Sequence, residues 1–458
     1  MTGICYTWRL LLKHPSFTAT AMLALALGIG ATTAMFGVVY AFLLRPLPFA
    51  APEELVMLQS RSTKSGTDVG VNYLDFVDWR EQSHSFSELA FFNLRWNGNL
   101  QARDGSTQTL KTTFTTANLF SLLGVAPTLG RNFVAADDEP NANQVVLISN
   151  RVWKQAYGGD PGIVGREVNL DGTPRTVVGV MPPGFRFPSQ TDLWVPSAAL
   201  FGSNHNRTWR ADQCIARLKR GTNVPLAQAE LTIICARLAR QFADTNKEIG
   251  VAVIPLREYW TGGVRASLVV LLAACAGVLL IACANVSQLL LARASSRERE
   301  LVVRAALGAT RRKLVCLLLT EAVMLTFFGS LGGVAIAFFL VQFVAAAIPI
   351  ELPFWIRIDI SPAVLGFTIA VSCFSALVAG SLPAWSNTRP DIAETLKSSG
   401  AGNTGSTEAG GGVRDLLTVA QVAVSIVLLV SANVVLRNMA KLREVAPGFD
   451  ARDVLMFE

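Results

Sequence analysis

Long apolar runs dominate the pattern of this chain. Five runs are long enough to cross a bilayer core of about 30 Å as helices. A mostly polar region, Arg45–Gly263, separates the first run from the second. The pattern predicts an α-helical membrane protein with about five transmembrane helices and a large α/β domain between spans 1 and 2. The runs are Phe17–Leu44, Ala266–Ala292, Leu314–Ile348, Pro362–Trp385 and Leu416–Leu436.

The polar region mixes strand and helix patterns, and it is large enough to hold a core of its own. Asp171-Gly172 lies between two apolar runs and is typical of a tight hairpin turn. Pro225 suits the first turn of a helix that two strand patterns flank. The predicted strands are Leu55–Ser60, Val145–Ile148, Val168–Leu170, Thr176–Val180, Cys214–Leu218 and Val251–Pro255, and the predicted helices are Asn72–Gln82 and Pro225–Phe242.

Basic residues beside the apolar runs set the expected orientation, because cytoplasmic loops are rich in Lys and Arg. Arg9 and Lys13 precede the first run, and a basic segment follows the second. The first run is too long for a cleaved signal, so we interpret it as a signal anchor. We expect Arg45–Gly263 and the short link Pro349–Ser361 to lie outside, and the Gly/Ser-rich Ser386–Gly412 to lie inside.

Composition supports the membrane class and offers no catalytic centre. Charged residues make up 16% of the chain, against about a quarter in soluble proteins. The net charge of +7 lies mostly beside apolar runs, where lipid explains it better than nucleic acid does. The sequence has no phosphate-binding loop, no nucleophile elbow and no zinc-protease motif, and its three histidines are scattered. We therefore expect no enzyme activity and no bound cofactor or metal.

Two polar features of the region after the first span leave alternatives open. Asp137–Glu139 is interpreted as a solvated acidic turn rather than a metal site. Cys214 and Cys235 are either two buried free thiols or, in an oxidising space, a disulfide. Neither feature predicts a function by itself.

The segment Ala294–Lys313 carries a dense mix of charges between two spans. Its apolar residues recur at helical spacing, which predicts a short amphipathic helix at the cytoplasmic membrane face. Such a helix is either a surface that a soluble partner pushes on or a basic loop that only fixes orientation. Glu321, near the inner end of the third span, is either a functional carboxylate or the ion-pair partner of Arg311 or Arg312.

Arg297–Ala309, followed by Glu321, forms a distinctive motif after the second span, and further motifs lie in the polar region. Together they resemble a known family, the MacB/FtsX-type ABC transporter permeases, in which a similar signature follows the second span. Other motifs resemble their periplasmic core domain, and the chain is most similar to the long two-repeat permeases common in acidobacteria. The core-domain motifs are Asp75–Arg80, Ala117–Phe120, Leu123–Pro127, Gly165–Arg166, Asn169–Gly172, Val178–Phe185 and Leu193–Pro196.

The resemblance implies a permease subunit in the cytoplasmic (inner) membrane that couples ATP hydrolysis by a separate cytoplasmic ABC ATPase to periplasmic conformational change, for efflux or mechanotransmission. The alternative is a membrane-anchored sensor or regulator with a periplasmic ligand-binding domain. The expected partners are that ATPase, membrane lipids, and a second copy of the chain or a second permease unit, but no nucleic acid. The residues expected to couple to the ATPase are Arg297, Glu298, Glu300, Arg304, Gly308 and Glu321.

The family's four-span unit would end with the fourth apolar run, so the fifth is expected to begin a second repeat. Pro447–Met456 is similar to Pro48–Met57, which follows the first span, and we expect a truncated two-repeat chain. The expected domains are 1–46, the N-terminal segment and span 1; 47–263, the periplasmic core domain; 264–388, spans 2 to 4 with a coupling helix at 294–313; 389–413, a flexible cytoplasmic linker; and 414–458, span 5 and the start of a second repeat.

Overall fold

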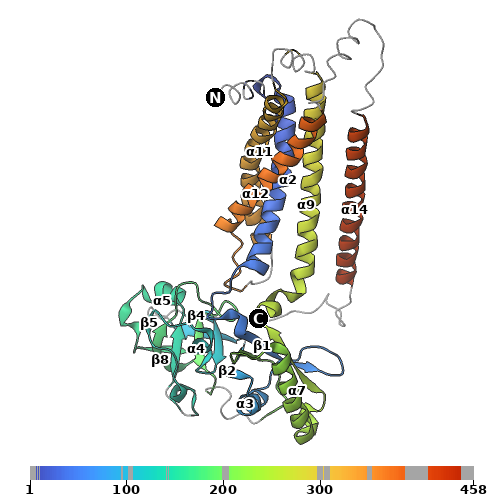
Figure 1. Ribbon diagram of the computed structural model, residues 1–458. Coiled ribbons are helices and arrows are strands. Elements are labelled where there is room, and N and C mark those ends of the chain that lie inside the picture. The colour runs from blue at the N-terminus through green and yellow to red at the C-terminus, as the bar shows by residue number, and fades with distance from the viewer. Residues whose placement is uncertain are drawn as a thin grey trace. The chain divides into compact units, whose positions relative to one another are not determined.

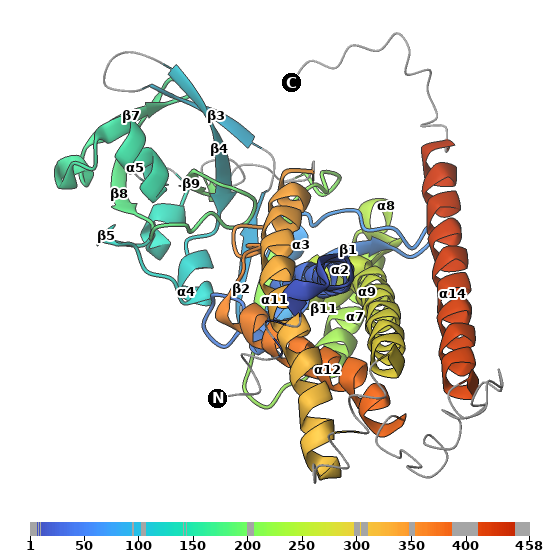
Figure 2. The ribbon, with the colours of Figure 1, turned by 90° about the horizontal axis from the view of Figure 1, so that it is seen from above.

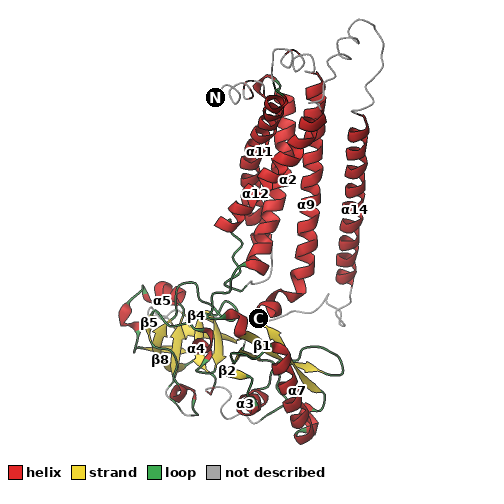
Figure 3. Cartoon of the chain, viewed as in Figure 1, coloured by secondary structure: helices red, strands yellow, loops and turns green. Residues whose placement is uncertain are grey.

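The chain divides into two compact units. The membrane unit comprises Met1–Ala41, Ala266–Ala347 and Ile358–Glu458, and the interspan unit comprises Phe42–Arg265 and Ile348–Arg357. Figure 3 shows that the strands belong to the interspan unit and that the membrane unit is helical. The computed structural model describes residues 7, 9, 11–93, 96–101, 107–140, 142, 144–198, 206–296, 303, 310–347, 353–386 and 411–444.

Five long helices make up the described part of the membrane unit (Figure 1). All five are long and apolar enough to cross a membrane, which agrees with the five predicted spans. The first of them continues into a π-helical turn at Tyr40–Leu44. The second starts well before the predicted boundary at Ala266, because polar residues extend the same helix. The helices are α2 (Pro15–Val39), α9 (Leu256–Ser296), α11 (Arg311–Ala347), α12 (Pro362–Ser386) and α14 (Gly411–Glu444).

Small residues allow α2 and α11 to pack closely. A Cβ atom added to Gly30 would lie 2.9 Å from the carbonyl oxygen of Gly333. One added to Gly329 would lie 2.8 Å from the Cβ of Leu25. Side chains do not fit at such distances, so glycine is what permits this approach between helix backbones.

Helix α14 makes little contact with the other described helices. Its apolar window, Asp415–Val434, has 0% of its residues buried. Its described neighbour is α9, where a Cβ atom added to Gly277 would lie 3.5 Å from a methyl group of Leu428. The small-residue face of α11 at Gly329–Gly333 packs against α2 and leaves no such close contact for α14. The residues after α14 that are similar to those after the first span lie outside the described part of the chain.

Four strands and two helices of the interspan unit form a β-α-β-β-α-β arrangement. Strand β1 lies between β10 and β11 and is antiparallel to both, and β10 pairs antiparallel with β2. The order β11-β1-β10-β2, with α3 and α7 as the crossover helices, is that of a ferredoxin-like sheet. The elements are β1 (Leu55–Ser62), α3 (Tyr73–Gln82), β2 (Phe86–Phe92), β10 (Gln213–Leu218), α7 (Val224–Gln241) and β11 (Ile249–Pro255).

Local signals explain where the two crossover helices begin. The side chain of Asn72 accepts a hydrogen bond from the Leu74 amide (2.8 Å) and caps α3. Asn223 caps α7 in the same way through the Leu226 amide (2.9 Å), and Pro225 lies in its first turn. Asparagine is a common residue at the start of a helix, so both caps could have been predicted from the sequence. The predicted helices Asn72–Gln82 and Pro225–Phe242 are confirmed.

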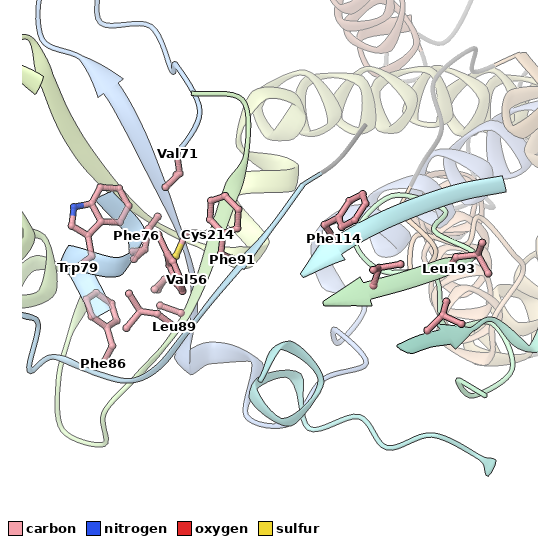
Figure 4. Packing of buried hydrophobic residues seen from close by; sticks show 14 of the residues in the cluster. Val56, Val71, Phe76, Trp79, Phe86, Leu89, Phe91, Phe114, Leu193 and Cys214 are labelled. Atoms are coloured by element: carbon pink, nitrogen blue, oxygen red, sulfur yellow. The ribbon is translucent and has the colours of Figure 1, made fainter. Parts of the chain in front are cut away.

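The core of this sheet lies between the strands and the two helices. Figure 4 shows Phe76 and Trp79 of α3 beside Val56, Phe91 and Cys214 of the strands. All five side chains are buried. Because burial of such large apolar surfaces drives folding, α3 is held firmly on the sheet.

The chain between β2 and β10 forms a second lobe. Strand β4 pairs with β3 on one side and, in parallel, with β9 on the other, which closes six strands into a ring (Figure 2). Asp171 (φ 53°) and Gly172 (φ 79°) form the predicted hairpin turn between β7 and β8. The strands are β3 (Trp96–Gln101), β4 (Thr107–Thr115), β6 (Val145–Ile148), β7 (Glu167–Leu170), β8 (Thr173–Val180) and β9 (Leu193–Pro196), and β5 (Leu129–Gly130) pairs with β8.

Candidate functional site

Most of the predicted coupling residues lie outside the described part of the chain. The helices on either side of that segment are described, since α9 ends at Ser296 and α11 begins at Arg311. The amphipathic helix therefore stays a prediction. The coupling residues outside the described ranges are Arg297, Glu298, Glu300, Arg304 and Gly308.

The sixth predicted residue, Glu321, forms a buried ion pair inside the membrane unit. Its Oε1 accepts a hydrogen bond from Nη1 of Arg293 at 2.6 Å, and the two side chains are 6% and 9% exposed. The expected partner was Arg311 or Arg312, and the partner that the structure shows is Arg293. The reason is that α9 stays helical past Arg293, which brings the guanidinium of Arg293 to the carboxylate of Glu321 on α11.

This ion pair joins three helices just before the predicted coupling segment. The guanidinium carbon of Arg293 lies 4.7 Å from the ring centroid of Phe17 on α2, within range of a cation–π contact. Removing one partner of a buried pair commonly costs about 3–5 kcal/mol, because the other charge is left without compensation. The pair can therefore hold the inner ends of α2, α9 and α11 as one body.

A second cluster, here called the collar, lies in the interspan unit and gathers chain segments that border different spans. It consists of Leu43, Arg45, Phe49, Arg257, Trp260, Phe354, Trp355 and Arg357, with Phe185 and Phe187 from the loop before β9. Arg257 at the start of α9 donates to the carbonyl oxygen of Leu43 at 2.5 Å. Arg45 donates to the carbonyl oxygen of Arg357 at 3.0 Å.

Trp355 is the centre of the collar. Its ring centroid lies 5.6 Å from that of Phe49, 5.7 Å from that of Trp260 and 6.0 Å from that of Phe187. The adjacent Phe354 contacts Trp355 (5.1 Å). Trp355 is only 8% exposed, although it lies in the short stretch between two spans. This stretch is thus packed into the interspan unit as part of its core.

Charged residues of the family-like motif Asp75–Arg80 have structural roles. Asp75 is 1% exposed. It accepts hydrogen bonds from Arg207 (2.8 Å), Arg210 and Asn246 (2.9 Å). The guanidinium of Arg207 also lies 3.8 Å above the ring of Phe242. This network fixes the chain before β10 onto α3 and the end of α7, and each buried charge is paired.

Asp212, which directly precedes β10, also has a buried carboxyl group, but its surroundings differ from those of Asp75. It is 4% exposed, and its Oδ2 has no hydrogen-bond partner within the described ranges. Burial raises its pKa from 3.8 to about 7. The folded protein therefore keeps this carboxyl group protonated at mildly acidic pH, where a free aspartate is ionised.

The acidic run before β6 differs from the expected solvated turn. Asp138 accepts hydrogen bonds from the amides of Ala117 (3.2 Å) and Ala198 (2.8 Å) and from the Ser197 hydroxyl (3.0 Å). Burial raises the pKa of Asp138. Its neighbour Asp137 pairs with Arg131 at 2.6 Å. Glu139 is exposed as expected. The environment of Asp138 was missed because its hydrogen-bond donors follow β4 and β9, which are distant in the sequence. No group of three metal-ligating side chains occurs among the described residues.

The two cysteines of the interspan unit are separate free thiols. Cys214 on β10 and Cys235 on α7 are both buried. Burial raises the pKa of Cys235 to about 12 and that of Cys214 also rises for the same reason. Buried thiols of this kind are packing residues with little reactivity.

Several residues of these sites were missed by sequence reasoning. Arg293 directly follows a long apolar run, which is the usual position of a basic residue that flanks a membrane span. Phe354 and Trp355 form an aromatic pair in a link of few residues, a signal in the sequence that was not used. The roles of these residues depend on contacts with residues that are distant in the sequence. Such contacts leave no local pattern in the sequence.

Two family models match the chain. One, described as a MacB-like periplasmic core domain, matches residues 18–234. The other, described as an FtsX-like permease C-terminal region, matches residues 272–389. The matched ranges include α3, the six-stranded ring, the Arg293–Glu321 pair and Trp355.

Similar curated proteins carry the name "Macrolide export ATP-binding/permease protein MacB". The one from Salmonella typhi is 24% identical over 281 residues, which cover 60% of this chain and 42% of the relative. The one from Chromobacterium violaceum is 27% identical over 276 residues, covering 58% and 40%. The chain thus spans about two fifths of the length of these relatives.

Solved structures of isolated domains are also similar. The periplasmic region of MacB from Actinobacillus actinomycetemcomitans has a TM-score of 0.37 at 14% identity, covering 49% of this chain and 97% of that one. The extracellular domain of the noncanonic ABC-type transporter YknZ from Gram-positive bacteria has a TM-score of 0.33 at 12% identity, covering 43% and 98%.

Proposed function

This chain is a permease of the MacB/FtsX type, and from that premise we propose that it couples a separate cytoplasmic ABC ATPase to movement of its periplasmic domain. The interspan unit is that domain. The predicted helix at 294–313 is the proposed docking surface, with Arg297, Glu298, Glu300, Arg304 and Gly308 in contact with the ATPase. Permeases are not an enzyme family, and the chemistry belongs to the partner.

The observation that carries this proposal is the collar. The stretch between α11 and α12 contributes Phe354 and Trp355 to the core of the interspan unit, and the first turn of α9 contributes Arg257 and Trp260. Segments that border four different helices are therefore packed together. Movement of any of these helices along its axis pulls on the same aromatic cluster.

The helices themselves suit the transmission of force. Helix α9 has 41 residues and α11 has 37, so they measure about 60 Å and about 55 Å at 1.5 Å per residue. Both exceed the thickness of a bilayer core of about 30 Å. A continuous hydrogen-bonded helix transmits a displacement at one end to the other. The Arg293–Glu321 pair sits at the inner part of both helices and ties them together.

We place the chain as a multi-pass protein of the inner membrane, with the interspan unit in the periplasm and residues 294–313 in the cytoplasm. The proposed division is 1–46, 47–263, 264–388, 389–413 and 414–458, with the last segment belonging to a second repeat. Labelling tests the orientation. Lys64→Cys, in an exposed turn, should react with a membrane-impermeant maleimide before the inner membrane is opened, and labelling only after lysis would contradict the topology.

ATPase stimulation tests the coupling. The full chain is reconstituted with a candidate ABC ATPase subunit, and hydrolysis is measured for the wild type and for Arg304→Glu and Gly308→Trp. Interface charge changes of this kind cost about 2–5 kcal/mol when the pair is buried, so stimulation should fall well over tenfold. Lys64→Glu is the matched control, because it reverses a charge of the interspan unit. Equal stimulation in all variants would mean that the segment only fixes orientation.

The alternative, a sensor or regulator, gives a different result in the same experiment. A sensor would transmit ligand binding inward and would not change ATPase turnover. An absence of any stimulation by the wild-type chain, with a ligand-dependent change at residues 294–313, would favour it.

A further inference from the structure

A cavity of about 780 Å³ lies in the interspan unit beside Trp355. Three arginines line it, Arg45, Arg186 and Arg357, and no carboxylate is among its described lining residues. Phe354 and Trp355 contribute an apolar wall. The cavity therefore combines positive charge with apolar surface, which suits an anion attached to an apolar body.

Arg186 is held in place but has an unused donor. Its Nη2 donates to the carbonyl oxygen of Gln190 (2.8 Å) and to the carboxylate of Asp192 (3.2 Å). Its Nε is buried and has no hydrogen-bond partner in the described part of the chain. A buried guanidinium N–H without an acceptor is unfavourable, so a small rotation of the Arg186 side chain that brings this N–H to an oxygen atom of a ligand in the cavity would be favourable.

The backbone beside Arg186 is strained in a way that fixes this geometry. Gln190, which also lines the cavity, has a φ of 55°. This left-handed conformation is uncommon for a residue other than glycine. Its carbonyl oxygen is the acceptor for Arg186. Strain of this kind persists where it positions a functional group, here a guanidinium at the cavity.

The position of the cavity in the chain indicates where its ligand comes from. Arg45 directly follows Leu44, the last residue of the helical turn that ends span 1. Arg357 comes shortly before Pro362, the first residue of α12. The ends of spans lie at the depth of lipid headgroups, so both arginines belong to that layer. Arg45 is tied to the Arg357 carbonyl, which keeps the two segments together.

We propose that this cavity binds the phosphate group of an anionic phospholipid from the outer leaflet. Arg186, through its unused Nε, and Arg357 donate to phosphate oxygens, since hydrogen bonds from a guanidinium to a phosphate are charge-assisted and strong. Phe354 and Trp355 contact the glycerol and the first methylene groups. A bound headgroup thereby stabilises the collar. The inference concerns lipid binding alone and does not depend on an ATPase partner.

Titration of the full chain in neutral detergent tests the inference without any ATPase. The probes are dihexanoyl-phosphatidylglycerol, dihexanoyl-phosphatidylcholine and inorganic phosphate, and calorimetry gives the affinities. Phosphatidylglycerol should bind at least about tenfold more tightly than the other two probes. Arg186→Gln and Arg357→Gln should each weaken it by about tenfold, the loss of one hydrogen bond to a charged group. Arg220→Gln, at an exposed site away from the cavity, should change nothing.

Three results would overturn the proposal. Equal affinity for the two lipids would show that the negative charge is not recognised. Phosphate binding as tight as that of phosphatidylglycerol would identify a site for free anions. Unchanged affinity in both Gln variants would place the lipid elsewhere. Arg357→Lys, which keeps the charge and is the safer change for folding, should retain most of the lipid preference, and its complete loss with an intact melting transition would also contradict the model.

Discussion

Replacement of Trp355 by alanine should release the stretch Pro353–Arg357 from the interspan unit. Trp355 contacts four aromatic rings, those of Phe49, Trp260, Phe187 and Phe354. Each aromatic pair contributes about 0.5–1.5 kcal/mol beyond burial, and truncation of a buried Trp commonly costs about 3–5 kcal/mol. We expect Trp355→Ala to weaken the packing of Pro353–Arg357 against the rest of the interspan unit by about 3 kcal/mol, the lower end of that range.

Hydrogen exchange of the Ile356 amide measures this loss directly. That amide donates to the carbonyl oxygen of Pro353 at 2.9 Å, so it exchanges only when the local turn opens. A loss of about 3 kcal/mol corresponds to exchange faster by roughly 150-fold. Trp355→Phe keeps one aromatic ring and should show a smaller increase. Trp209→Ala is the control, because Trp209 is a tryptophan of the same unit that is 60% exposed.

The reasoning would be refuted by exchange at Ile356 that stays within a fewfold of the wild type in Trp355→Ala. An equal increase in Trp209→Ala would refute it too, since the effect would then reflect general loosening of the unit. In the reconstituted system, Trp355→Ala should leave ATPase docking intact and reduce only the response of the periplasmic domain.

Three further predictions concern stability. Glu321→Ala should lower the free energy of unfolding of the membrane unit by about 3–5 kcal/mol. The double change Arg293→Met with Glu321→Met should recover most of that loss, because neither charge is then left without a partner. Additive losses in a double-mutant cycle would argue against the ion pair. Because burial raises the Asp212 pKa to about 7, the folded state retains a proton that the unfolded chain releases, so the contribution of Asp212 to stability should be greatest below pH 4 and fall as pH rises to 7. Asp212→Asn should remove that fall in urea titrations from pH 4 to 8, and an unchanged pH profile would contradict the assignment. Deletion of Ser398–Glu458 should leave the melting midpoint in detergent nearly unchanged, since the α14 window is exposed; a drop of several degrees would show that the fifth span belongs to the first bundle.

Much of the secondary structure was predictable because its signals are local. The helix pattern over Asn72–Gln82, the turn Asp171-Gly172 and Pro225 at the start of a helix each placed an element within a few residues. The spans followed from length and apolarity. The start of α9 was missed by a wide margin, because the residues from Leu256 are polar and still helical. Hydropathy marks where a helix enters lipid rather than where it begins.

The functional clusters were predictable only in part, because they depend on pairing between distant segments. Glu321 stood out as an ionisable residue in a span, but its partner Arg293 follows from how two helices align. The pairing of β4 with β9 and the burial of Trp355 also depend on contacts between segments that are distant in the sequence. The five other predicted coupling residues lie outside the described part of the chain, so their role stays a prediction.

The ferredoxin-like sheet has a consequence for how the protein is made. Both neighbours of β1 are strands from the far end of the domain, and Leu58 pairs with Cys214 across about 150 residues of sequence. During synthesis and export, β1 therefore emerges with two open edges and waits until β10 and β11 arrive. Folding of such non-local contacts is slow, and unpaired edges invite aggregation. The six-stranded ring, whose strands lie closer together along the chain, can form during this delay. The edges of β1 therefore stay unpaired until the chain up to Pro255 is available to complete the sheet.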